Sequence, residues 1–174
     1  HVAGATGKTS EAAMRNYFDL PLEALVDMGD FAGGMLKYLR DHPVPRVTIA
    51  GGFAKMVKLA QGNMDLHSSR SQVDFDILGA WLKEIGATEE TAGSARKANT
   101  AAEGLDFAGA LPIADLVARR LQQPYLAPRQ GEDEEAAVGQ QGQQRFDVEA
   151  LGHHHPLRHL DGDQHLQCHQ HVHQ

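Results

Sequence analysis

The clearest structural signal in the sequence is the run Arg46-Val47-Thr48-Ile49-Ala50-Gly51-Gly52-Phe53-Ala54-Lys55-Met56-Val57-Lys58-Leu59-Ala60-Gln61-Gly62. Its first five residues are of strand-forming type and stop at a glycine pair, and apolar residues then recur with the period of a helix. The stretch therefore predicts a strand, a tight turn and a helix. Two glycines in such a turn let a ligand approach the backbone, and the first N–H groups of the helix are donors for an anion.

A second unit of the same kind precedes it. Residues 23–27 form a short strand pattern, Met28-Gly29-Asp30 a turn, and residues 31–40 a helical pattern that ends at His42-Pro43-Val44-Pro45. Two such units with short connections predict parallel strands joined by right-handed crossovers, which is the α/β class. Ligands of parallel sheets bind beyond the carboxyl ends of the strands. We therefore expect Gly29-Asp30 and Gly51-Gly52 to lie side by side in one cleft.

The N-terminal run Ala3–Glu11 contains Gly7-Lys8-Thr9 and partly matches a phosphate-binding loop. The full pattern needs a glycine where this chain has Val2, and no strand is expected before the loop. The sequence predicts a glycine turn that leads into a helix over about residues 9–18. Direct ligand contact by Gly7 and Thr9 is the alternative, and it would make the chain a nucleotide-binding or regulatory module.

Several candidate side chains follow the central stretch. Lys55 and Lys58 are three residues apart, so we expect them on one side of their helix, as a solvated face or as cations for a ligand. His67-Ser68-Ser69-Arg70 lies on the loop that leaves this helix, where a histidine is more often a surface residue than a catalyst. Further helical patterns cover residues 74–82, 96–108 and 113–121, residues 86–95 read as a linker, and Trp81 is expected in the core.

Charge differs between the two parts of the chain. The 174 residues carry a formal net charge of −7; residues 1–121 hold 13 Lys/Arg and 15 Asp/Glu, and residues 122–174 hold 3 and 8. A nearly balanced body lacks the basic surface that nucleic acid or an anionic membrane would require, and no apolar run has transmembrane length. The single cysteine, Cys168, excludes an internal disulfide and fits a reducing compartment, so we expect a cytoplasmic protein. Because the chain starts at His1, we also expect it to lack an N-terminal portion.

Residues 122–174 are rich in Gln, Glu and His and include eight of the eleven histidines. The pairs His155/His159 and His165/His169 would suit a metal ion if they were helical. Apolar periodicity is nearly absent, however, and such a segment cannot bury enough surface to offset the entropy of ordering it. We therefore expect a disordered or frame-shifted tail and no metal site.

Three blocks of the sequence, Gly29–Leu39, Ala50–Met56 and Leu66–Phe75, resemble the C-terminal half of the cobalt-precorrin-5B C(1)-methyltransferase family of anaerobic cobalamin synthesis. Shorter blocks extend the likeness over about residues 1–120: Ala5–Glu11, Ala98–Ala101 and Ala114–Val117. The resemblance implies that residues 1–121 are an α/β methyltransferase-like domain from the C-terminal portion of a larger two-part enzyme. The family's N-terminal half and its final strand-forming segment have no counterpart that we find, the latter beyond about Arg120.

This resemblance also implies an activity, the transfer of a methyl group from S-adenosylmethionine to C-1 of a cobalt-bound tetrapyrrole, giving cobalt-precorrin-6A. Cobalt enters only as part of the substrate. On this reading the cofactor-facing residues are Gly7, Thr9, Gly29, Asp30, Gly33, Gly51 and Gly52. Lys55, Lys58 and Arg70 would pair with peripheral carboxylates of the tetrapyrrole, and His67 and Ser68 would orient the substrate or accept a proton. No nucleic acid or membrane partner is expected, a homo-oligomer is left open, and an inactive fragment is a further alternative.

Overall fold

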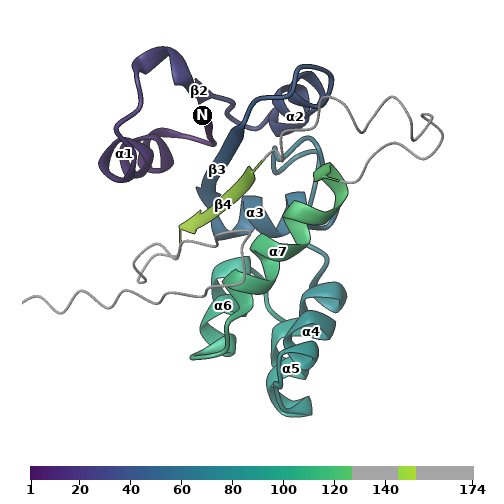
Figure 1. Ribbon diagram of the computed structural model, residues 1–174. Coiled ribbons are helices and arrows are strands. Elements are labelled where there is room, and N and C mark those ends of the chain that lie inside the picture. Colours follow the sequence, from purple (N-terminus) through teal and green to yellow (C-terminus); the bar gives the residue numbers. More distant parts are fainter. Residues whose placement is uncertain (127–144, 152–174) are drawn as a thin grey trace, which may run out of the picture.

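The computed structural model describes residues 1–126 and 145–151 of the chain (Figure 1). Its described strands form one parallel sheet in the order β2-β1-β3-β4. They are β1 (Val2–Ala5), β2 (Leu25–Asp27), β3 (Arg46–Gly52) and β4 (Arg145–Leu151). The predicted α/β class with parallel strand–turn–helix units is confirmed.

Helices lie on both faces of this sheet. They are α1 (Lys8–Tyr17), α2 (Ala32–Asp41), α3 (Phe53–Ala60), α4 (Phe75–Glu84), α5 (Glu89–Arg96), α6 (Ala101–Ala108) and α7 (Ile113–Leu126), and a short 3-10 turn spans Leu22–Ala24. On one face, Met14 of α1 packs with Ala3 and Ala50. Helices α2, α3 and α7 share the core on the opposite face, while α4, α5 and α6 extend from the far end of α3 and α7 (Figure 1). No helix among the described residues is both long and apolar enough to cross a bilayer.

The first strand occupies a place that the sequence did not predict. β1 precedes the Gly7 turn, although no strand was expected there, and it lies at the centre of the sheet. Ala3 is in register with Leu25 of β2 on one side and with Thr48 of β3 on the other. The turns at Gly29-Asp30 and Gly51-Gly52 therefore follow strands that are separated by β1, not neighbouring strands as predicted.

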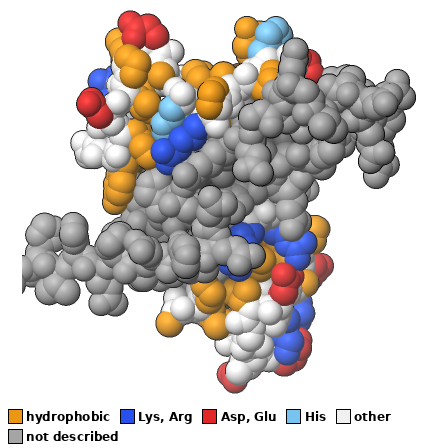
Figure 2. All heavy atoms as spheres, viewed as in Figure 1, with side chains coloured by type: hydrophobic (Ala, Val, Ile, Leu, Met, Phe, Trp, Pro, Cys, Tyr) orange, Lys and Arg blue, Asp and Glu red, His pale blue; other side chains and the backbone are white. Residues whose placement is uncertain are grey.

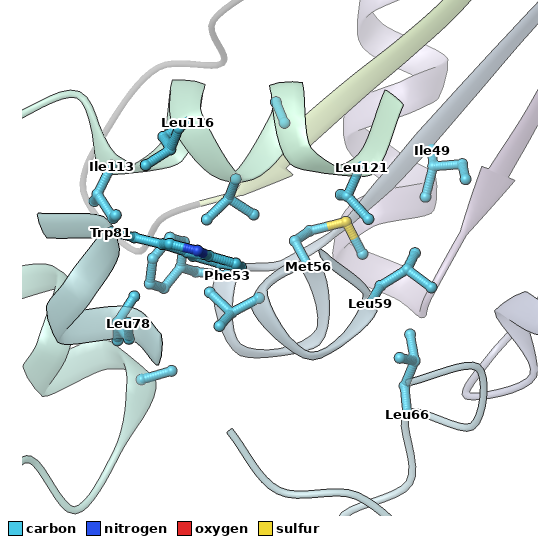
Figure 3. Close-up of a cluster of buried hydrophobic side chains, with 14 of the residues drawn as sticks. Ile49, Phe53, Met56, Leu59, Leu66, Leu78, Trp81, Ile113, Leu116 and Leu121 are labelled. Atoms are coloured by element: carbon cyan, nitrogen blue, oxygen red, sulfur yellow. The ribbon is translucent and has the colours of Figure 1, made fainter. Parts of the chain in front are cut away.

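The larger core is built around α3. Met56, Val57 and Leu59 of this helix are fully buried, and they pack with residues of α2, α4 and α7. Trp81 is 8% exposed and belongs to the same cluster, so its predicted core role is confirmed. Figure 3 shows Trp81 beside Phe53, and it shows Leu66 directed toward α3 near Leu59. The loop that follows α3 is thereby attached to the core.

Two sequence expectations about the second half of the chain are wrong. Residues 89–96 form helix α5, not a linker; Thr88 caps it by accepting from the backbone N–H of Thr91. This helix buries only Ala92 and Ala95, which is why its apolar signal is weak. The second expectation was that no strand-forming segment follows about Arg120. Strand β4 contradicts it, because it pairs with β3 along its whole length, from Arg46↔Arg145 to Gly52↔Leu151.

The sequence of β4, Arg-Phe-Asp-Val-Glu-Ala-Leu, alternates polar and apolar residues with the period of a half-buried strand. The composition of the surrounding segment concealed this pattern. Helix α7 also continues past residue 121 to Leu126, so a boundary at residue 121 falls within a helix. The histidine pairs His155/His159 and His165/His169 lie outside the described residues, as does Cys168.

Candidate functional site

The order of the strands determines where a ligand can enter the sheet. From β1 the chain turns to α1 on one face, and from β3 it turns to α3 on the other face (Figure 1). Where two adjacent parallel strands send their connections to opposite faces, a crevice opens at their carboxyl ends. That switch point lies between β1 and β3. The candidate site is therefore centred on Thr6-Gly7, which directly follow β1, and on Gly51-Gly52, which end β3.

Two adjacent glycines at the end of β3 have different roles. A Cβ on Gly51 would lie 2.8 Å from Thr6 Oγ1 and 2.5 Å from Met56 Cε, so Gly51 lets β1, β3 and α3 pack closely. Gly52 is exposed, with φ −62° and ψ 147°, a conformation open to any residue. A Cβ on Gly52 would meet no heavy atom of the described residues within 4 Å. Packing explains Gly51, whereas Gly52 borders open space where a ligand can approach the backbone.

The other predicted cofactor-facing glycines divide in the same way. A Cβ on Gly33 would lie 2.6 Å from Met64 Cβ, and the Gly33 N–H donates to Met64 O at 3.0 Å, so this glycine packs against the loop after α3. Gly29 has φ +50°, the left-handed region that favours glycine, and its N–H donates to Asp27 Oδ1 at 3.2 Å. Among the described residues, no heavy atom lies within 4 Å of the Cβ position of Gly29, which follows β2, or of Gly7, at the start of α1. Gly7 and Gly52 are therefore the two that border the crevice between β1 and β3 with room for a ligand.

Lys55 links the turns at the carboxyl edge. Its Nζ donates to Thr6 O at 2.7 Å and lies 3.1 Å from Asp30 Oδ1, with side-chain exposures of 33% for Lys55 and 27% for Asp30. Asp30 Oδ1 is itself buried and accepts no aligned hydrogen bond from the described residues, so the contact with Lys55 is an ion pair. One side chain of α3 thus connects the turns that follow β1 and β2. Because of it, the Asp30 turn lies close to the crevice although β1 separates β2 from β3.

We expect this ion pair to couple the two turns measurably. In a double-mutant cycle of Lys55→Met and Asp30→Asn, urea unfolding should give a coupling free energy of about 1 kcal/mol, the upper end for partly exposed pairs. The more exposed Arg15–Glu11 pair of α1 is the control, and Arg15→Met with Glu11→Gln should give about 0.3 kcal/mol. Equal coupling in the two cycles would mean that the Lys55–Asp30 contact does not hold the turns together.

His67 and Ser68 lie on the exposed surface of the loop between α3 and α4. His67 Nδ1 accepts from the Ser69 backbone N–H at 3.2 Å and lies 2.7 Å from Ser69 Oγ. A neutral ring with an accepting Nδ1 carries its proton on Nε2, so Nε2 is a donor. This geometry suits His67 better for orienting an acceptor on a ligand than for removing a proton. The Ser68 carbonyl accepts from Gln72 Nε2.

Two further predicted residues are near this loop and differ in exposure. The Arg70 side chain is 73% exposed, and its Nε lies 3.7 Å from Asp65 Oδ2. Lys58 is only 6% exposed, and its Nζ donates to Leu66 O and, at 3.4 Å, to Ser71 O. Residues 61–71 fold back over α3 and cover Lys58. The expected shared surface of Lys55 and Lys58 is therefore absent, and the Lys58 ammonium group is held by carbonyl groups of the chain.

The burial of Lys58 has a consequence for stability. Burial lowers the pKa of its ammonium group below the usual 10.5; Asp30 and Asp65 raise this pKa, and Lys55 lowers it. Between the lowered pKa and 10.5, the unfolded chain holds more protons than the folded chain, so the free energy of unfolding rises with pH. The wild type should gain stability relative to Lys58→Met as the pH rises from neutral to 10.5. Urea unfolding of both proteins measures this difference; a constant or falling difference would contradict the prediction.

The opposite end of the molecule is occupied by exposed ion pairs. Glu89 pairs with Arg96 at 2.8 Å and with Lys83 at 3.2 Å, and Arg120 Nη2 lies 2.6 Å from Glu84 Oε2. The hydrogen bond from Arg96, followed by that from Lys83, lowers the pKa of Glu89. In Figure 2 acidic and basic side chains are interspersed in this α4–α5 region. The charges there are paired with each other, far from the switch point, so we do not include them in the candidate site.

The tertiary structure thus brings together Thr6, Gly7, Asp30, Gly52 and Lys55, and it connects the His67 loop to them through the hydrogen bond from Leu66 N to Asp30 O, at 2.8 Å. Thr6 was not included in the candidate site predicted from the sequence. Recognising Val2–Ala5 as a strand would have placed Thr6 at the carboxyl end of that strand, where ligands of parallel sheets bind. Thr9 is exposed in the first turn of α1, where its cofactor contact stays a prediction. Within the described part of the chain, no group of three or more His, Cys, Asp or Glu could hold a metal ion.

Comparison with known proteins shows which family the chain resembles. The model of the CbiD C-terminal domain matches residues 65–132. Three relatives are each named cobalt-precorrin-5B C(1)-methyltransferase. The one from Methylorubrum extorquens is 61% identical over 121 residues, which cover 68% of this chain and 34% of the relative. The one from Paramagnetospirillum magneticum is 59% identical over 120 residues (69% and 34%), and the one from Halorhodospira halophila is 56% identical over 128 residues (72% and 34%).

The chain spans about a third of the length of these curated relatives. No solved structure matches it. The family model and the relatives agree in the family to which they point, and each of these relatives matches about two thirds or more of the chain. Over the residues matched, the chain therefore belongs to the cobalt-precorrin-5B C(1)-methyltransferase family.

Proposed function

We propose that this chain takes part in the methylation of cobalt-precorrin-5B at C-1, which gives cobalt-precorrin-6A in cobalamin biosynthesis, with S-adenosylmethionine as the methyl donor. The observation that carries the proposal is the 61% identity over 121 residues to a relative named for this reaction. The tetrapyrrole is the proposed small-molecule partner, and its cobalt belongs to the substrate. We place the reaction in the cytoplasm, without a nucleic acid or membrane partner, and leave a homo-oligomer open.

The residues at the switch point fit a cofactor of this kind. Gly7 and Gly52 border open space, so backbone groups there are approachable, and the first turn of α1 offers N–H donors to a carboxylate. Asp30 supplies a partly exposed carboxylate that can accept from an ammonium or hydroxyl group. When bound, S-adenosylmethionine supplies an electrophilic methyl group on a sulfonium. In this proposal Gly7, Thr9, Gly52 and Asp30 hold the cofactor, while Gly29, Gly33 and Gly51 shape the turns around it.

The protein's contribution to methyl transfer is mainly alignment, because the electron-rich macrocycle provides the nucleophilic carbon. Arg70 is well exposed and only loosely paired with Asp65, so its guanidinium group is available to a peripheral carboxylate of the tetrapyrrole. Lys55 is the second candidate, with part of its side chain exposed beside the crevice. His67 orients the substrate through its Nε2–H, and Ser68 lies next to it in the same exposed loop.

The alternative of a nucleotide-binding module loses its geometric support. β1 does supply the strand that a phosphate-binding loop needs, but it ends at Ala5, and α1 begins at Lys8. Only Thr6 and Gly7 lie between them. A phosphate-binding loop places about four residues between its two glycines so that successive N–H groups surround the phosphates. This turn is too short for that arrangement.

Calorimetry on the full chain tests the proposal. We expect S-adenosylhomocysteine to bind and ATP–magnesium to give no heat of binding. Binding of ATP–magnesium alone would refute the methyltransferase proposal. A methylation assay with cobalt-precorrin-5B on the same preparation then separates an active protein from an inactive fragment: cofactor binding without product formation identifies the inactive fragment.

A further inference from the structure

Lys58 is a charged side chain in a place where an apolar one would fit. It is buried on α3 between Val57 and Leu59, both of them fully buried, and its ammonium group points into the loop that follows the helix. Burying a charge is costly unless it is paired and hydrogen-bonded. A methionine of similar volume would fill the same space without that cost. The charge therefore needs an explanation that packing does not provide.

The partners of the ammonium group supply one. Lys58 Nζ donates to the carbonyl oxygens of Leu66 and Ser71. In the sequence these two residues directly precede and directly follow the segment of residues 67–70. The nearby carboxylates of Asp30 and Asp65 stabilise the charged form of Lys58, and the ammonium group of Lys55 destabilises it. The short segment that carries the candidate site residues is thus closed at both ends by one buried cation.

Other contacts attach the same loop to the turn after β2. Leu66 N donates to Asp30 O at 2.8 Å, and the Leu66 side chain is 1% exposed in the core. Gly33 N donates to Met64 O at 3.0 Å. The first half of the loop is therefore fixed to the carboxyl edge of the sheet. The contact between Lys58 and Ser71 O, with Ser71 Oγ donating to Asp65 O at 2.7 Å, closes the second half onto the first.

We propose that Lys58 is a positioning residue: its buried ammonium group holds the two ends of residues 66–71 together and so fixes His67 and Ser68 at the carboxyl edge of the sheet. The significance of that placement for methyl transfer rests on the proposed function. The ordering of the loop does not, because it depends only on contacts within the chain.

Hydrogen–deuterium exchange on the full chain, without cofactor or substrate, tests the ordering. Lys58→Met should accelerate exchange at least about tenfold at the amides of Leu66, Arg70 and Ser71, because removing the cation leaves two buried carbonyl groups unsatisfied and the loop opens locally. The amides of β3 should change by less than threefold, roughly the change that a small shift in global stability produces. Val57→Ala, a neighbouring core truncation, is the matched control and should accelerate exchange without selectivity for the loop.

The His67 ring gives a second readout, which a purely structural role would leave unchanged. Its nitrogen and carbon-bound proton resonances in the wild type report a ring held by Ser69, and in Lys58→Met they should move to the values of an unstructured histidine. The ring of His42, which directly follows α2 and stacks on Tyr38, should not move. If Lys58→Met does not fold, Lys58→Gln replaces it in both measurements, with the same expected changes.

Uniform exchange changes together with an unshifted His67 signal would overturn the proposal. Failure of the proposed function is distinguishable, because it appears in the calorimetry with S-adenosylhomocysteine. Loop opening in Lys58→Met without any cofactor binding by the wild type would remove the methyltransferase proposal and leave the positioning role. Cofactor binding by the wild type together with an unaffected loop in Lys58→Met would remove the positioning role and leave the methyltransferase proposal.

Discussion

Gly51→Ala should destabilise the chain by about 1–3 kcal/mol, the range for forcing an extra methyl group into a packed core. The new Cβ would lie 2.5 Å from Met56 Cε and 2.8 Å from Thr6 Oγ1, so β1, β3 or α3 would have to shift. Gly52→Ala, one residue further along, should change the free energy of unfolding by less than about 0.5 kcal/mol, as expected for surface substitutions. Urea unfolding of both variants measures this contrast.

The same pair tests whether the crevice takes a ligand. A methyl group at Gly52 would occupy the open space beside the backbone, so we expect Gly52→Ala to weaken binding of S-adenosylhomocysteine about tenfold or more, which corresponds to roughly 1.4 kcal/mol. Calorimetry on the folded variant gives the affinity directly. Wild-type affinity in Gly52→Ala would show that the ligand does not approach this glycine, and the site would then have to lie elsewhere. Comparable destabilisation by the two alanines would contradict the assignment of Gly51 alone to packing.

His67→Ala should lower the rate of single-turnover methylation by about a hundredfold, the lower range for a positioned acid, base or donor group. The loss should be mainly in the rate constant, since we propose that the glycine turns, and not His67, bind the cofactor. The measurement needs a full-length enzyme that carries this sequence, because the chain spans about a third of its relatives. Near-normal methylation would remove His67 from the site.

Ser69→Ala is the matched control for this histidine. It removes the hydroxyl group that lies 2.7 Å from Nδ1 but keeps the backbone N–H that donates to the same nitrogen. We expect a loss of only a few fold, because one of the two contacts that orient the ring remains. A loss as large as that of His67→Ala would show that the hydroxyl group, not the backbone, determines the orientation of the ring.

Part of this molecule was readable from its sequence because the signals are local. The β-branched run at residues 46–50 and the apolar period from Phe53 onward are properties of neighbouring residues, and they predicted β3 and α3 correctly. The same holds for the Gly29 turn, which needs a positive φ. Helix α5 was missed because its surface is nearly all polar, and β4 was missed because a Gln- and His-rich composition surrounds a short alternating pattern.

The candidate site depended on information that no local pattern contains. Gly51 and Gly52 are equivalent in the sequence, and only the approach of Thr6 and Met56 distinguishes the packing glycine from the one beside open space. Lys55 and Lys58 are likewise a simple pair of helical lysines until residues 61–71 cover one of them. Periodicity shows which side of an element is apolar, but not which other segment will pack on its polar side.

From the sequence alone, the class of the fold and the two strand–turn–helix units could be predicted, and resemblance pointed to the family. The place of β1 between β2 and β3, and with it the switch point between β1 and β3, became known only from the packing of the strands. The tertiary structure also showed that Lys55 faces the crevice while Lys58 lies beneath the loop. Secondary structure follows from contacts a few residues apart, whereas strand order and burial follow from contacts between segments that are distant in the chain.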